Sequence, residues 1–78
     1  METIQVVDAR GLEPPEPMER VMEALSVMRP GCKVQLLLYR EPHPLYAILQ
    51  RNHYAYRSTL RDDGTWEILI WEEAAVKG

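Results

Sequence analysis

The length, composition and charge of this chain confine it to one small folded unit. It has 78 residues, of which 46% are hydrophobic, so it can form one core but has no room for a second domain. Its formal net charge is −3 and its basic residues form no run, which excludes the usual electrostatic footprint for nucleic acid or an anionic membrane. The N-terminus does not resemble a signal peptide, and the apolar runs, such as residues 36–39, are too short to span a bilayer. We therefore expect a single cytoplasmic domain over residues 1–78.

The first half of the sequence predicts a strand, a helix and a second strand. Residues 3–8 are rich in β-formers and lead into a turn. A helix is predicted to begin near Pro15, because proline suits a first helical turn, and apolar residues then recur every three or four positions until Arg29-Pro30-Gly31 ends it. Residues 33–39 alternate as a second strand. The core-facing residues of that strand are Val34, Leu36 and Leu38.

The second half of the sequence predicts a short helix and a hairpin. A proline-bracketed turn over residues 40–44 leads into a helix that ends at Asn52. Residues 54–60 alternate as a strand, Asp63-Gly64 is typical of a tight hairpin, and alternating apolar residues from Trp66 form the last strand. The order β-α-β-α-β-β predicts an α/β (α+β) two-layer sandwich, with a mixed four-stranded sheet and both helices on one face.

The sheet face away from the helices is expected to be open and unusually apolar. The alternation assigns Gln5, Val7 and Gln35 to it, together with larger apolar side chains. A contiguous exposed apolar patch usually marks an interface, so this face is a candidate surface for a protein partner or a second copy of the chain. The alternative, that the ends of the chain cover the face, stays open. The residues predicted to form the contact are Leu37, Tyr39, Leu69 and Trp71.

The segment from Asp8 to Pro17, D-A-R-G-L-E-P-P-E-P, lies between the first strand and the amphipathic helix. It resembles the TusA/SirA-like sulfur-carrier family, whose hallmark there is Gly-Leu-x-Cys-Pro-x-Pro, and the element order agrees over nearly the whole chain. Pro14 stands where the sulfur-carrying cysteine of that family would be. The resemblance is therefore to the domain-of-unknown-function branch that lacks the motif cysteine. The matching motif residues are Gly11, Leu12, Pro15 and Pro17.

The carboxyl ends of the two parallel strands are expected to meet at one rim of the sheet, where open α/β sheets bind ligands, and to form a small polar pocket there. Anion binding there is disfavoured because prolines lack the N–H groups that would donate. The alternative, that charged residues in these turns are only solvated, stays open. The residues predicted to line the rim are Asp8, Arg10, Glu13, Pro14, Pro15, Glu16, Pro17, Arg40, Glu41 and His43.

The sequence predicts no catalytic group, metal or cofactor. His43 and His53 would be separated by roughly 15 Å along a helix and cannot share an ion. These features favour a non-catalytic module that binds a protein or a small ligand rather than an enzyme. The alternative is a sulfur-transfer or redox carrier that uses rim carboxylates or Cys32, although this lone cysteine is expected at the opposite edge of the sheet from Pro14.

Overall fold

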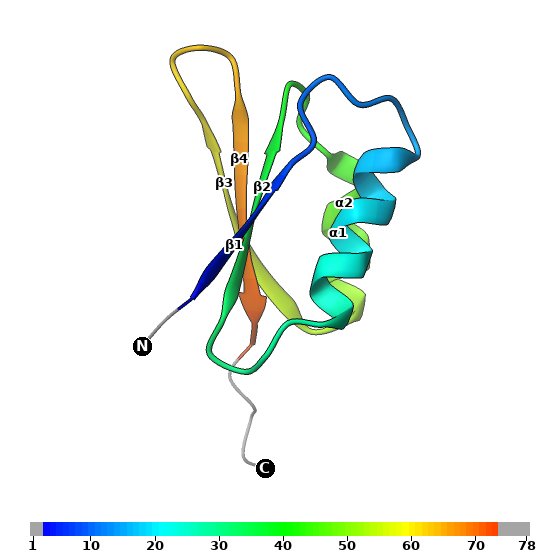
Figure 1. Cartoon of the computed structure of the whole chain (residues 1–78), viewed down its shortest axis with the longest axis vertical. Helices are drawn as coiled ribbons and strands as arrows, with labels where there is room; N and C mark the ends of the chain where they lie inside the picture. The colour runs from blue at the N-terminus through cyan, green and yellow to red at the C-terminus, as the bar shows by residue number, and fades with distance from the viewer. Residues whose placement is uncertain (1–2, 74–78) are drawn as a thin grey trace.

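The computed structural model describes residues 3–73, which form six elements in the predicted order. A sheet makes one layer and two helices make the other (Figure 1). This arrangement confirms the predicted two-layer α+β sandwich. The strands are β1 (Ile4–Asp8), β2 (Lys33–Leu38), β3 (Tyr54–Leu60) and β4 (Trp66–Glu72), and the helices are α1 (Glu16–Ser26) and α2 (His43–Arg51).

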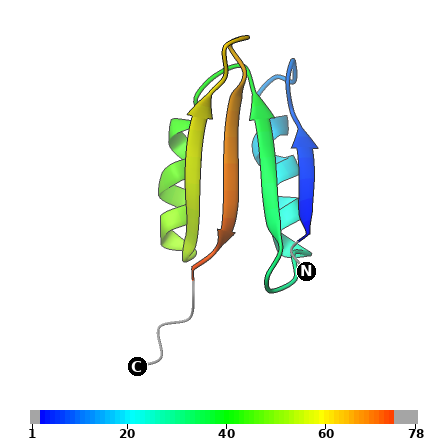
Figure 2. The ribbon, with the colours of Figure 1, turned by 90° about the vertical axis from the view of Figure 1, so that its left-hand side faces the viewer.

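The sheet is mixed, with the strand order β1-β2-β4-β3. β1 pairs with β2 in parallel, whereas β4 is antiparallel to both of its neighbours. β3 therefore runs parallel to β2, with β4 inserted between them. Both β-α-β units return the chain in the same direction and place α1 and α2 on the same face, so that Figure 2 shows the uncovered face toward the viewer with both helices behind it.

α1 begins and ends where its prolines require. Pro17 occupies its first turn, where a missing N–H costs nothing, and the acidic Glu16 and Glu19 complement the positive end of the helix. The helix ends at Ser26, earlier than the predicted stop at residues 29–31. The ring of Pro30 would clash with the Ser26 carbonyl if the helix continued, so the stop acts one turn ahead of the proline itself.

The core lies between the sheet and the two helices. β2 and β4 are the central strands, and Leu36 and Ile68, which face each other across them, are both fully buried. Val21 of α1 and Leu49 of α2 are fully buried against this surface. The two central strands thus contribute the layer on which both helices pack.

The side of the sheet on which the β1 side chains lie differs from the prediction by one residue. Val7 pairs with Leu36 and belongs to the core, so its assignment to the uncovered face is wrong. Gln5 shares the helix-side face with Val7, while Ile4 and Val6 lie on the uncovered face and are 48% and 55% exposed. β1 contains both polar and apolar residues on each side, so its alternation alone does not determine which side faces the core.

Truncation of a core side chain should destabilise the protein far more than truncation of an exposed one. Leu49→Ala removes a fully buried side chain and leaves a cavity, so we expect the free energy of unfolding to fall by about 2–5 kcal/mol. Leu60→Ala, at a 56% exposed position, should change it by less than about 1 kcal/mol. Urea denaturation of both variants measures the difference, and similar losses would contradict the assigned core.

Candidate functional site

Three connections meet at the end of the sheet where β1 and β2 finish (Figure 1). Two are the predicted rim loops, residues 9–15 before α1 and residues 39–42 before α2. The third is the β3–β4 hairpin over residues 61–65, which the sequence analysis did not place at the rim. Arg10 and Asp63 interact electrostatically, so the hairpin contributes charge to the same edge. Neither residue type nor spacing reveals this proximity, because it depends on β4 lying next to β2.

A cleft of about 740 Å³ lies between the two rim loops. Its lining is mainly apolar, so the prediction of a polar pocket is wrong, because core side chains reach the cleft. The buried residues that line it are Ala9, Leu36, Leu38 and Leu45. Several predicted rim residues border it, namely Glu13, Pro14, Pro15, Pro17, Arg40 and Glu41. The remaining predicted rim residues, Asp8, Arg10, Glu16 and His43, do not line this cleft.

Tyr39 also lines the cleft, although the strand alternation assigned it to the uncovered sheet face. β2 ends at Leu38, so Tyr39 belongs to the loop and does not follow the alternation of the strand. Its side chain is 60% exposed. The cleft therefore has an accessible aromatic ring at its border.

The loop before α1 uses its backbone donors internally. The Leu12 N–H donates to the Ala9 carbonyl at 3.2 Å, and the Glu16 N–H donates to the Glu13 carbonyl at 3.0 Å. Gly11 has a φ of 81°, in the left-handed region that glycine adopts without strain, and the Pro14–Pro15 peptide bond is cis. Because the Leu12 and Glu16 amides are bonded within the loop and its prolines lack N–H groups, few donors remain to form a cradle for phosphate.

Asp8, the last residue of β1, forms a bidentate ion pair with Arg10. The Arg10 Nε donates to Asp8 Oδ1 at 2.9 Å and Nη2 donates to Oδ2 at 2.8 Å. The Arg10 side chain, together with its backbone N–H, holds the pKa of Asp8 at about 2. The Arg10 guanidinium is therefore already paired with the neighbouring Asp8 carboxylate.

A chain of hydrogen bonds ties the β2–α2 loop to β3. The Tyr46 hydroxyl donates to Glu41 Oε2 at 3.0 Å and lies 2.6 Å from Ser58 Oγ. His43 Nε2 lies 3.3 Å from the other Glu41 oxygen, and Tyr46 stacks on Tyr56 with ring centroids 4.5 Å apart. Burial, together with the neighbouring Glu41, raises the pKa of Tyr46 further above neutral pH, where its phenol is a hydrogen-bond donor. The tertiary contact with Ser58 was not predictable from the sequence.

The uncovered sheet face is less apolar than predicted. Lys33 places its ammonium 5.1 Å from the centre of the Trp71 ring. Gln35 donates to Glu67, which also pairs with Arg61 at 2.9 Å and has its pKa lowered chiefly by that arginine. Leu37 faces this side but is only 7% exposed, while Leu69 and Trp71 are half-buried. Polar side chains therefore interrupt the predicted apolar patch.

Cys32 and the two histidines do not come together with one another. Cys32 precedes β2 and lies at the opposite end of the sheet from Pro14, as the parallel pairing predicts. His43 begins α2, whereas His53 follows it and lies 4.0 Å from Glu73. Within residues 3–73, no three His, Cys, Asp or Glu side chains are arranged to hold a metal ion, and no helix there is long and apolar enough to cross a membrane.

The matched family and a solved structure agree with this architecture. Residues 6–72 match the family described as "Uncharacterized conserved protein (DUF2249)". The chain belongs to this family. The SirA-like protein from Desulfitobacterium hafniense has a similar crystal structure, with a TM-score of 0.77 and 23% identity over 95% of this DUF2249 chain and 100% of the other. This likeness confirms the TusA/SirA-like fold, and none of the curated proteins compared with the chain matches it.

The Asp8–Arg10 pair should have a measurable signature in acid. Arg10→Gln removes the guanidinium, so we expect the pKa of Asp8 to rise from about 2 toward its ordinary value of 3.8. Because the folded pKa is lowered, the stabilisation from this pair is present above pH 3.8 and is lost as the pH falls toward 2. Carboxyl carbon NMR titration of both proteins measures the shift. An unchanged Asp8 titration in the variant would show that the pair does not form.

Proposed function

We propose that this DUF2249 chain is a non-catalytic TusA/SirA-like binding module that holds a segment of a partner protein in the rim cleft. The observation that carries the proposal is the cleft of about 740 Å³ with a mainly apolar lining. It lies at the carboxyl ends of β1 and β2, the edge at which open α/β sheets receive ligands. Its size falls within the range of ordinary ligand sites.

The residues at the cleft favour binding over sulfur transfer. Pro14 occupies the position of the family cysteine and lines the cleft, so no thiol is available there to carry sulfur. Cys32 precedes β2, at the opposite end of the sheet, and so is too far away to act at the same site. The rim carboxylate of Glu41 is occupied by Tyr46 and His43, which makes it a structural anchor for the loop.

The residues that border the cleft favour a peptide segment over a compact small molecule. Exposed residues from both rim loops lie at its border, among them Pro14 and Tyr39. Prolines restrict the backbone of both loops, so little conformational entropy is lost when a partner binds. An exposed tyrosine beside an apolar floor is the kind of anchor that contributes strongly to protein interfaces.

Tyr39 offers a direct test of the proposed binding site. A screen of peptides and fragments by ¹⁵N chemical-shift mapping should find compounds that shift the amides of Leu12, Leu38 and Leu45. Tyr39→Ala should lower the affinity for these compounds by about tenfold, because it removes an aromatic contact at the cleft. Leu60→Ala removes an exposed apolar side chain outside the cleft and serves as the matched control. Compounds that instead map to Ile4 and Val6 would contradict the proposal and favour the uncovered face.

A further inference from the structure

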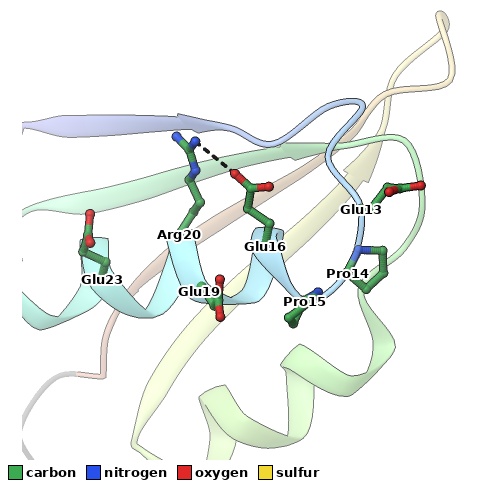
Figure 3. Close-up of a pocket in the computed structure, with 7 residues that line it drawn as sticks. All are labelled: Glu13, Pro14, Pro15, Glu16, Glu19, Arg20 and Glu23. Carbon is green, nitrogen blue, oxygen red and sulfur yellow. Dashed lines mark hydrogen bonds and ion pairs between the residues drawn. The ribbon is translucent and has the colours of Figure 1, made fainter.

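An acidic groove lies beside the cleft, along the exposed side of α1 (Figure 3). It has a volume of about 730 Å³, and four glutamates line it. Glu13, Pro14 and Pro15 border both this groove and the cleft, so the two hollows meet at the proline turn. The other residues that line the groove are Glu16, Glu19, Arg20 and Glu23.

Most of the negative charge in this groove is not neutralised. Arg20 lies 3.2 Å from Glu16, whereas Glu13, Glu19 and Glu23 have no ion pair among residues 3–73 (Figure 3). The positive end of the helix favours acidic residues only within the first turn, which covers Glu16 and Glu19. Glu23 lies beyond that turn, and like charges four residues apart, as at Glu19 and Glu23, disfavour the helix. Helix stability therefore does not explain the full set of carboxylates.

We infer that the occupant of the cleft is an extended, basic peptide segment, an inference that rests on the proposed function. An apolar side chain of the segment enters the cleft, and Lys or Arg side chains reach the carboxylates of the acidic groove. Glu19 and Glu23 are separated by roughly 6 Å along the helix axis. Side chains on one side of an extended chain repeat at roughly 6.6 Å, so basic residues at alternate positions match these two carboxylates.

The experiment is a selection of randomised heptapeptides that bind the full chain. We expect enriched peptides to combine one bulky apolar residue with two Lys or Arg residues at alternate positions. The double variant Glu19→Gln/Glu23→Gln should lower the affinity for a selected peptide by about tenfold, which corresponds to about threefold for each exposed ion pair. Its affinity should also fall as salt is raised from 50 to about 500 mM, because exposed charges are screened. Fluorescence anisotropy with the labelled peptide measures both effects.

The control variant is Glu72→Gln/Glu73→Gln, which changes the net charge equally at the opposite end of β4 and should leave the affinity unchanged. Peptides that need Tyr39 but show no basic preference would overturn this inference and leave the proposed function standing. Failure to enrich any peptide, or binding that is insensitive to Tyr39→Ala, would overturn both. An equal loss of affinity in the α1 variant and in the control variant would also overturn the inference. It would show a general effect of net charge rather than contact with α1.

Discussion

The parallel pairing of β1 with β2 is the constraint on which the candidate site depends. Its register sets Val7 opposite Leu36 and brings the carboxyl ends of both strands to the same edge. Each strand then leads through a loop into a helix, so both helix N-termini and both proline-containing loops lie at that edge. An antiparallel pair would instead have placed the end of one strand beside the start of the other. The cleft follows from this topology, because its floor and its two walls come from these same segments.

The prolines of the first loop change what that edge can do. Helix N-termini usually attract anions through free N–H groups. Here Pro14, Pro15 and Pro17 contribute no such donors, and Glu13 and Glu16 supply negative charge in their place. The loop is thereby converted from an anion site into an acidic turn with a restricted backbone. Pro14 also takes the position of the sulfur-carrying cysteine, so one substitution removes both the nucleophile and an amide donor. These changes are compatible with docking and remove the local basis for sulfur transfer.

The sequence predicted the layers and the element order more successfully than the fine geometry. β2 and α1 have strong apolar periodicity, so their core faces were predicted correctly. β1 is a short edge strand with polar and apolar residues on both sides. The prediction of which side chains face the core was therefore wrong by one position, at Val7. Tyr39 was misplaced because a strand end cannot be located to a single residue from alternation. The electrostatic interaction of Asp63 with Arg10 and the contact of Ser58 with Tyr46 join segments far apart in the chain, and no local pattern encodes them.

The two surfaces that the sequence proposed for binding differ in how many of their polar and charged side chains already have partners within the protein. On the uncovered sheet face, Glu67 is shared by Gln35 and Arg61, and the ammonium of Lys33 lies over the Trp71 ring. A partner on that face would have to displace or cover these internal contacts, at a cost in desolvation. The rim differs, because its internal bonds fix the loops from behind while the apolar lining of the cleft and the carboxylates of α1 stay accessible. Under the proposed function, the rim is favoured over the uncovered face because most of the α1 carboxylates have no ion pair within residues 3–73 and the apolar lining of the cleft is accessible.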